Sequence, residues 1–194
     1  MGRLAGTEAR LASRNPNKAR ELERLLPGWT IEPIDVDDYP PETGEDYYAN
    51  AHAKAAYGRD HADSDAWVFG EDSGIEVSGL GGGPGVQSAR SGGDDPVAWL
   101  LSELKGLEGR ARRARYVSEL VGLAPDGREV RGAGTLAGVI AHEARGSEGF
   151  GFDPIFVPDG EESTVAELGN EWKAENSHRA RAVRAFREAL GEAG

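Results

Sequence analysis

The sequence predicts an α/β protein built on a mixed sheet. In the first half of the chain, short apolar segments typical of strands alternate with segments that carry helix-capping residues, and two longer strand-like segments follow. The chain has 194 residues, and about half of them are apolar when its 28 glycines are counted, as in globular domains. We therefore expect a single domain over residues 1–194 with a core of its own.

Caps and breakers place the elements of the first half. These are a strand over 9–13, a helix over 17–26, a strand over 29–36 and a helix from about 43 to 61. Asn15 followed by Pro16 is typical of a helix start, and Pro27 with Gly28 ends that helix. Thr43 opens a segment that resembles a capping box, which predicts the start of the second helix.

The second half is expected to begin with a buried strand over 66–70, a loop over 71–74, a short strand over 75–77, irregular backbone over 79–85 and a helix over 97–104 capped by Asp95. The segments 116–124 and 129–140 flank a Pro-Asp-Gly turn and predict a β-hairpin. An apolar segment over 150–157 follows, and Ser177 is predicted to cap the last helix.

Composition excludes several classes of protein. The net charge is −12, from 34 acidic and 22 basic residues, so nucleic acid would be repelled. The chain has no cysteine, which excludes thiol nucleophiles, iron–sulfur clusters and Cys-ligated zinc. No apolar run is long enough for a membrane span or a signal peptide. We expect a soluble, cytoplasmic protein that binds neither nucleic acid nor membrane.

The familiar signatures of several enzyme classes are missing. The sequence contains no G-x-G-x-x-G, no Walker A lysine, no H-E-x-x-H and no G-x-S-x-G. A dinucleotide-dependent dehydrogenase, a P-loop NTPase, a zinc protease and an α/β hydrolase therefore each lose the motif that usually identifies them.

Two polar clusters suit phosphate and metal chemistry. Ser13–Lys18 lies at a predicted helix start, where backbone N–H groups and the helix dipole favour an anion. Lys18 is unfavourable for the helix alone, and a bound phosphate would offset it. Glu71 and Asp72 follow a buried strand, and paired carboxylates suit Mg²⁺. An ordinary capped helix and an acidic surface turn would account for the same residues.

Three further clusters have both a functional and a structural interpretation. Asn50 and Lys54 share one face of a predicted helix, where they could equally be a solvated polar face. Phe150–Pro154 could stack on a base and read its edge, or simply pack two Phe side chains into the core. Ser177–Arg179 offers donors at a helix start, or an ordinary cap.

The order of these motifs resembles the inosine triphosphate pyrophosphatase family, also called Ham1-like, whose members act on noncanonical purine nucleotides. The matching segments cover about residues 9 to 190 and are Ser13–Glu21, Glu42–Ala55, Glu71–Gly74, Gly82–Arg90, Gly149–Phe156 and Lys173–Arg179. The resemblance implies an elongated mixed sheet flanked by helices, with two lobes, a central cleft and a homodimer. It also implies Mg²⁺-dependent hydrolysis of ITP, dITP and XTP to the monophosphate and pyrophosphate.

The resemblance also implies roles for individual residues. Asp72 would be the general base, with Lys18 and Lys54 as the other catalytic residues, and the Mg²⁺ ligands would be Glu42 with Glu71 or Asp72. The nucleotide would be bound by Ser13, Arg14, Asn15, Pro16, Asn17, Lys18, Ser73, Arg90, Phe150, Gly151, Phe152, Asp153, Lys173, His178 and Arg179.

The sequence departs from the family pattern at two site positions. Arg14 stands where a Gly is common, and it would either add charge to the triphosphate site or point away. Glu71 replaces the commoner Asp. Two alternatives remain: a Maf-like pyrophosphatase acting on pyrimidine nucleotides, since Leu11–Lys18 resembles the opening motif of that family, and a nucleotide-binding module without turnover.

Overall fold

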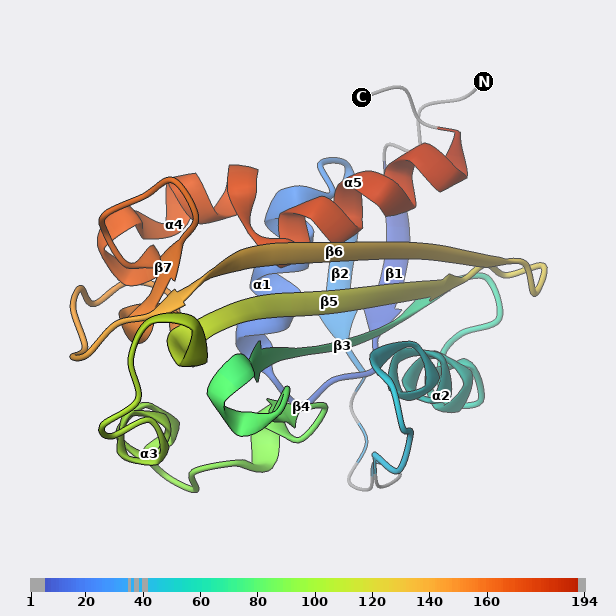
Figure 1. The fold of residues 1–194 in the computed structure, drawn as a ribbon. Coiled ribbons are helices and arrows are strands. Elements are labelled where there is room, and N and C mark those ends of the chain that lie inside the picture. Colours follow the sequence, from blue (N-terminus) through green and yellow to red (C-terminus); the bar gives the residue numbers. More distant parts are fainter. Residues whose placement is uncertain (1–5, 35, 37–38, 40–41, 192–194) are drawn as a thin grey trace. The chain divides into compact units, whose positions relative to one another are not determined.

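The computed structural model describes residues 6–34, 36, 39 and 42–191. Its strands are β1 (Thr7–Leu11), β2 (Trp29–Pro33), β3 (Trp67–Val77), β4 (Pro84–Gly85), β5 (Arg113–Leu123), β6 (Glu129–Ile140) and β7 (Phe156–Pro158). They form a mixed sheet in the order β2-β1-β3-β5-β6-β7, with β4 paired to β3 (Figure 1). The α-helices are α1 (Pro16–Leu25), α2 (Tyr47–Arg59), α3 (Pro96–Glu103), α4 (Val165–Asn176) and α5 (His178–Leu190).

The chain divides into two compact units. Unit 1 comprises Met1–Asp72, Ser118–Gly134 and Arg179–Gly194, and unit 2 comprises Ser73–Val117 and Thr135–His178. β3, β5 and β6 therefore each contribute residues to both units. This α/β architecture agrees with the fold class that the sequence predicts.

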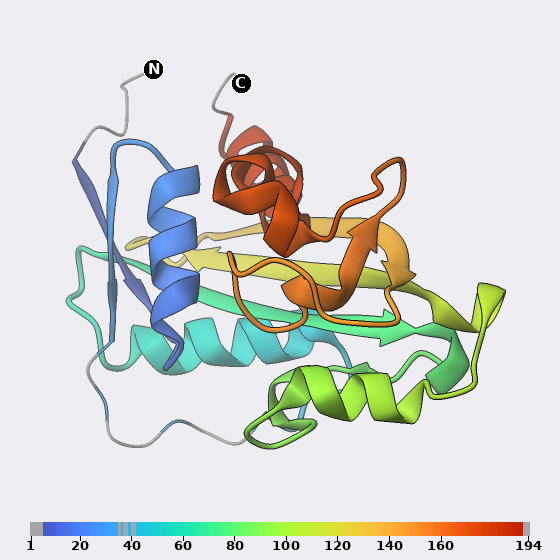
Figure 2. The same ribbon diagram turned by 90° about the vertical axis from the view of Figure 1, so that its left-hand side faces the viewer.

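In unit 1 the alternation of side chains along β3 separates two cores. Phe69 packs in the core that contains Leu22 of α1 and Phe186 of α5. Val68 points the other way, into a small cluster with Ile34. Because successive side chains of a strand face opposite sides of the sheet, α1 and α5 cover one face of β3 and α2 covers the other (Figure 2).

The contact between β3 and α2 depends on a glycine. A Cβ atom on Gly70 would lie 2.0 Å from the carbonyl oxygen of Ala51 and 2.5 Å from the nitrogen of Ala55, both in the backbone of α2. The helix thus rests directly on the strand at this point, and the next residues of the strand are brought close to the side chains of α2.

Replacing Gly70 by Ala is expected to lower the free energy of unfolding by about 3 kcal/mol, since the new methyl group overlaps backbone that cannot rotate away. Urea denaturation followed by circular dichroism measures this. Gly81→Ala is the control: Gly81 has φ +62° and open space around it, so only the backbone conformation costs energy, about 1 kcal/mol. Equal losses for the two variants would contradict the close contact.

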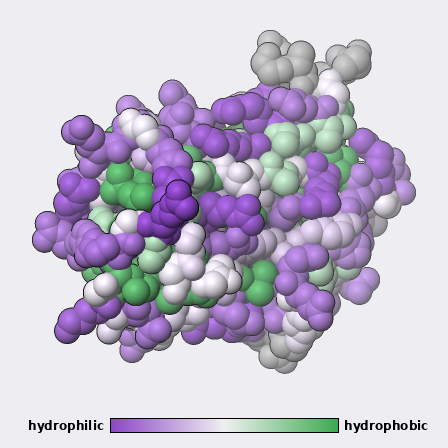
Figure 3. Space-filling view, viewed as in Figure 1, coloured by the Kyte–Doolittle hydropathy of each residue, from purple (hydrophilic) through white to green (hydrophobic). Residues whose placement is uncertain are grey.

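Unit 2 has a separate core. Ile75 and Leu100 pack there with Tyr116, Phe152 and Phe156. β7 pairs antiparallel with β6, with Val157 opposite Val139. Hydrophilic side chains predominate on the face seen in Figure 3. In the part of the chain that the structure describes, no helix is long and apolar enough to cross a membrane.

Most predicted elements are confirmed, including the helix capped by Asn15, the helix capped by Asp95 and the hairpin of β5 and β6. Several boundaries differ, and the strand predicted over 9–13 is β1, which spans Thr7–Leu11. The helix α2 is capped by Asp46, whose side chain accepts from the nitrogen of Ala49, and Thr43 is not the cap. β2 ends at Pro33, although the backbone nitrogen of Ile34 still donates to the carbonyl of Leu11 at 2.9 Å; residue 35 of the predicted strand lies outside the described residues. Part of the predicted 79–85 loop forms a 3-10 turn, Ser78–Leu80, and the short strand β4.

The predicted loop over 71–74 is wrong, because β3 continues without a break through Val77. Two carboxylates favour a loop in the sequence, yet both are buried here, Glu71 at 0% and Asp72 at 4% exposure. Helix α4 is an element that the sequence analysis missed. Its Thr164 and Glu167 form a capping box, and this signature is visible in the sequence.

Candidate active site

Glu71 and Asp72 lie at the centre of the polar residues of unit 1, on opposite faces of β3. Glu71 shares the orientation of Phe69 and faces α1 and α5, whereas Asp72 shares the orientation of Gly70 and faces α2. Two adjacent residues of one strand therefore build two different clusters of charge.

The first cluster surrounds the Glu71 carboxylate. Oε2 lies 2.6 Å from the Nζ of Lys18. Oε1 accepts from the hydroxyl of Ser118 at 2.9 Å and from Nε and Nη2 of Arg179 at 3.2 and 3.1 Å. The remaining guanidinium nitrogen, Nη1, donates to Glu21 of α1.

These charges fix the protonation state of Glu71. Burial works against its carboxylate, but Arg179 and Lys18 outweigh burial and hold the pKa of Glu71 well below its usual range. Burial likewise works against the charged form of Arg179, and Glu71 with Glu21 raises its pKa above the usual value. Glu71 is thus a carboxylate and Arg179 a cation at neutral pH, and the two form a buried ion pair.

The second cluster surrounds Asp72. Its Oδ1 accepts from the Nζ of Lys54 at 2.8 Å, and the same ammonium contacts Oε1 of Glu42. Its Oδ2 accepts from the amide of Asn50 at 3.1 Å. The Asn50 oxygen in turn accepts from the backbone nitrogen of Gly44 at 2.8 Å. The predicted pair of Asn50 and Lys54 on one helix face is therefore brought to a carboxylate.

Burial shifts the two titrating groups of this cluster. Burial raises the pKa of Asp72, and the nearby Lys54 ammonium only partly offsets this effect. For Lys54, burial opposes the charged form, but Asp72 and Glu42 together raise its pKa. A buried carboxylate with a raised pKa next to a lysine is suited to accept a proton.

The loop before α1 is held by its own side chains. The backbone nitrogen of Asn15 donates to the Ser13 hydroxyl at 3.1 Å, and Asn15 accepts from the nitrogen of Asn17 at 2.9 Å. Pro16 occupies the first turn, as predicted. The Arg14 guanidinium lies over the ring of Tyr39, 5.1 Å from its centroid.

Unit 2 gathers the residues predicted to meet the base around Asp153. Its Oδ2 accepts from the Nζ of Lys173 at 2.7 Å and from the backbone nitrogen of Phe150 at 2.8 Å. The Lys173 ammonium also lies 4.0 Å from the centroid of the Phe150 ring. The Tyr116 hydroxyl donates to Oδ1 at 3.3 Å, and its ring stacks on His178 at 4.5 Å.

Other predicted site residues have different surroundings. Phe152 is buried in the core of unit 2 and does not present an open aromatic face. Arg90 donates to Gln87 and to the carbonyl of Val86. Gly151 has φ +64°, a conformation that favours glycine, and Ser73 is half-buried in the part of β3 that belongs to unit 2.

Arg179 differs most from its predicted role. The sequence groups it with His178 as a contact to the base, but its guanidinium binds Glu71 and Glu21 in unit 1 and is 2% exposed. His178 stacks on Tyr116 in unit 2. Two consecutive residues thus join different clusters because helix α5 begins where the chain passes from unit 2 to unit 1.

The predicted metal ligands do not form one group. Among the described residues, no three acidic or histidine side chains are arranged to hold a metal ion. Glu42 and Asp72 both contact the Lys54 ammonium, so their oxygens lie around one cation. Glu71 lies on the other face of β3, and both of its oxygens already contact Lys18, Arg179 or Ser118.

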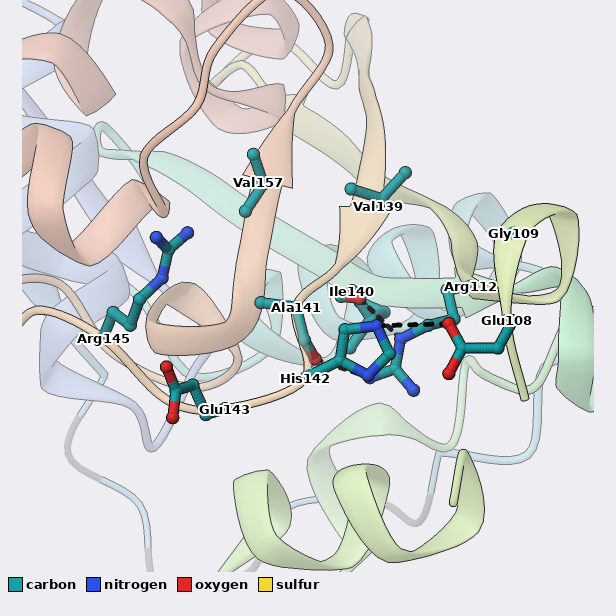
Figure 4. A pocket seen from close by; sticks show the side chains of 10 residues that line it. All are labelled: Glu108, Gly109, Arg112, Val139, Ile140, Ala141, His142, Glu143, Arg145 and Val157. Carbon is teal, nitrogen blue, oxygen red and sulfur yellow. Dashed lines mark hydrogen bonds and ion pairs between the residues drawn. The ribbon is translucent and has the colours of Figure 1, made fainter. Parts of the chain in front are cut away.

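Unit 2 also carries a pocket beside β6 and β7, shown in Figure 4. Its lining includes Arg112, whose guanidinium donates to the backbone carbonyls of Leu104, Ile140 and Ala141. The exposed pair of His142 and Glu108 also lines it. None of the predicted site residues lines this pocket, and Arg112 connects the end of α3 to the end of β6 through these carbonyls.

A family comparison matches nearly the whole chain. Residues 9–189 match the model of the Ham1 family. The chain belongs to the Ham1 family. All of the predicted site residues, from Ser13 to Arg179, lie inside the matched range.

Individual relatives agree with the Ham1 match. The chain is 42% identical to a protein of Thermus thermophilus named dITP/XTP pyrophosphatase, over 96% of this chain and 93% of that one. Among solved structures, it is similar to the Ham1 protein of Staphylococcus aureus, with a TM-score of 0.81, 31% identity and coverage of 95% and 98% of the two chains. It is also similar to a nucleoside-triphosphatase, or dITP/XTP pyrophosphatase, of Mycobacterium abscessus, with a TM-score of 0.72, 40% identity and coverage of 92% and 98%.

Three residues of these clusters, Ser118, Tyr116 and Glu21, have no role in the sequence-based prediction. Ser118 lies 47 residues from Glu71, and Glu21 lies 158 residues from Arg179. No local pattern marks such contacts. Glu21 falls in the first family motif, which indicates that this position has a role. Its partner, Arg179, is known only from the structure.

Proposed function

We propose that this protein removes ITP, dITP and XTP from the nucleotide pool by hydrolysing them to the monophosphate and pyrophosphate, in the presence of Mg²⁺. Relatives at about 40% identity over nearly the whole chain are named dITP/XTP pyrophosphatases, and the chain is accordingly a nucleoside triphosphate pyrophosphatase. The observation that carries the proposal is the buried Asp72, held between Lys54 and Asn50 in the second charge cluster.

Asp72 is proposed as the general base. Its carboxylate accepts a proton from a water molecule, whose oxygen forms a new bond to the α-phosphorus while the bond between that phosphorus and the bridging oxygen breaks and pyrophosphate leaves. The raised pKa of Asp72 favours this proton transfer. Lys18 and Lys54 would stabilise the charge on the phosphate oxygens, which is the main task in phosphoryl-group chemistry.

Two carboxylates of this cluster, Glu42 and Asp72, fit a magnesium ion. Glu42 and Asp72 place carboxylate oxygens around the position of the Lys54 ammonium, and hard oxygen ligands of this kind are those that Mg²⁺ prefers. When bound by these two carboxylates, Mg²⁺ would neutralise phosphate charge. Glu71 is the less suitable ligand, since its oxygens already contact two cations and a hydroxyl.

Base selection is proposed for the cluster in unit 2. Hypoxanthine and xanthine carry an acceptor at position 6 where adenine carries a donor. Lys173 and His178 can donate to such an acceptor, and Phe150 can stack on the ring. ATP would leave buried donors unpaired, which gives large discrimination.

Two further parts of the proposal concern the oligomeric state of the protein and its location in the cell. The family resemblance implies a homodimer, which analytical ultracentrifugation tests at micromolar concentration. A cytoplasmic location follows from the proposed task, because the protein would act on the free nucleotide pool.

The direct test is pyrophosphate release with Mg²⁺ from ITP, XTP, GTP, ATP, dTTP and UTP at alkaline pH. Rapid release from ITP and XTP, with the monophosphate as second product, supports the proposal. Turnover of dTTP or UTP instead would favour the Maf-like alternative. Binding of ITP without turnover would favour a binding module and would direct attention to Arg14 and Glu71.

Lys173→Met is expected to lower the ratio of kcat/KM for ITP to that for ATP by at least tenfold, because the variant loses a buried donor for the 6-oxo group. Steady-state kinetics with both nucleotides measures the ratio. Lys105→Met, which changes an exposed lysine of the same unit, is the matched control and should keep the wild-type ratio. An unchanged ratio in Lys173→Met would remove Lys173 from base selection.

A further inference from the structure

Glu71 contacts side chains from three different elements of the fold. Its carboxylate is fully buried, and it joins Lys18 of α1 to Arg179 of α5 and Ser118 of β5. The two carboxylate oxygens have different partners. Oε2 contacts the lysine, and Oε1 accepts from the arginine and the serine.

The surroundings of Lys18 show what this arrangement achieves. Lys18 occupies the first turn of α1, where the helix dipole disfavours a cation. A lysine side chain there would also have many rotamers. The contact with Glu71 at 2.6 Å offsets the dipole and restricts the ammonium to one place. An ammonium has three N–H donors, so one carboxylate contact leaves it able to bind a phosphate oxygen.

The partners on the other oxygen fix the carboxylate itself. Arg179 is buried and donates twice to Oε1, and its remaining nitrogen is tied to Glu21. Ser118 lies on β5, the strand next to β3, and is also buried. With three donors on one oxygen, the carboxylate has little freedom to turn, so the oxygen that faces Lys18 stays in place.

We propose that Glu71 is a positioning residue that holds the Lys18 ammonium ready for the triphosphate, and that Ser118 and Arg179 act on Lys18 through Glu71. The inference rests on the proposed function, in which Lys18 binds phosphate. It gives Glu71 a task other than metal binding, and it gives Ser118 a task in turnover.

A double-mutant cycle tests the inference. Glu71→Gln should lower kcat for ITP by about tenfold in the wild-type background and by less than about twofold in Lys18→Met, because a residue that acts through Lys18 has nothing to act on once Lys18 is gone. Ser118→Ala and its double variant with Lys18→Met repeat the cycle with a smaller perturbation. This second cycle decides the matter if Glu71→Gln does not fold.

The Mg²⁺ concentration that gives half-maximal rate separates positioning from metal binding. It should stay at the wild-type value in Ser118→Ala and Glu71→Gln and rise severalfold in Glu42→Gln. Glu119→Gln is the matched control for loss of a paired carboxylate in unit 1, since Glu119 binds Arg131 on the other face of β5. It should keep the wild-type kcat.

The outcomes are distinct. Losses of kcat that persist undiminished in Lys18→Met, or a raised Mg²⁺ requirement in Ser118→Ala, would overturn the inference while the wild-type enzyme remains active on ITP. If the wild-type protein turns over neither ITP nor XTP, the proposed function fails, and the task assigned to Glu71 fails with it. Loss confined to backgrounds that retain Lys18 supports the inference.

Discussion

Replacing Asp72 by Asn is expected to lower kcat for ITP by a hundredfold or more while the dissociation constant for ITP changes only a few-fold. The amide has nearly the same shape, and its oxygen can still accept from Lys54, whereas its nitrogen cannot accept from the Asn50 amide as the carboxylate does. It cannot take a proton from water, and a general base contributes about 10²- to 10⁴-fold. Pyrophosphate release measures kcat, and isothermal titration calorimetry measures binding.

Asp159→Asn is the matched control for Asp72→Asn. Asp159 is also paired with a cation, Arg113, but it lies in unit 2 at the surface. Its variant should keep the wild-type kcat. Turnover by Asp72→Asn within tenfold of wild type would contradict the role of general base, and loss of ITP binding would show that Asp72 holds the nucleotide instead.

Replacing Arg179 by Met is expected to lower the free energy of unfolding at pH 7 by about 3–5 kcal/mol, the usual cost of removing one partner of a buried ion pair. The methionine fills much of the space but leaves Glu71 and Glu21 without their shared cation. Urea denaturation measures the change. Arg131→Met is the control, since Arg131 also binds a glutamate twice but is half-exposed, and its variant should lose less than about 1 kcal/mol.

The pH dependence of Arg179→Met has a definite sign. In the wild-type protein the pKa of Glu71 is depressed in the folded state, so its ion pairs stabilise the fold above the ordinary glutamate pKa, about 4, and this contribution is lost as the pH falls further. Without Arg179 the depression is smaller. The difference in stability between variant and wild type should therefore be largest near pH 7 and shrink below about pH 4. A difference that is constant with pH would contradict the ion-pair explanation.

Local chemistry in the sequence predicts much of this fold. Asn15 with Pro16, and Asp95 with Pro96, mark helix starts that the structure contains, because a capping side chain and a proline satisfy backbone groups within a few residues. The Pro-Asp-Gly turn likewise predicts the hairpin of β5 and β6. The family match is also predictable, since the motifs lie in the expected order along the chain.

Long-range contacts explain what the sequence could not show. The sequence predicts a loop at Glu71 and Asp72, and isolated carboxylates are indeed costly to bury. They occupy a buried strand because Lys18, Lys54 and Arg179 are brought to them from distant segments. Lys18 is unfavourable at a helix start, and the sequence suggests that a bound phosphate offsets its charge. In the structure the Glu71 carboxylate does so.

The alternation of β3 makes the length of this segment as significant as its composition. Adding or removing one residue between Trp67 and Gly70 would turn every later side chain to the opposite face. Glu71 would then meet α2, and Asp72 would meet α1 and α5, so both charge clusters would be lost while every residue type was retained. The turn over 125–127 is free of this constraint. Within this family, insertions should accumulate in such turns, and the strand should keep a fixed count of residues.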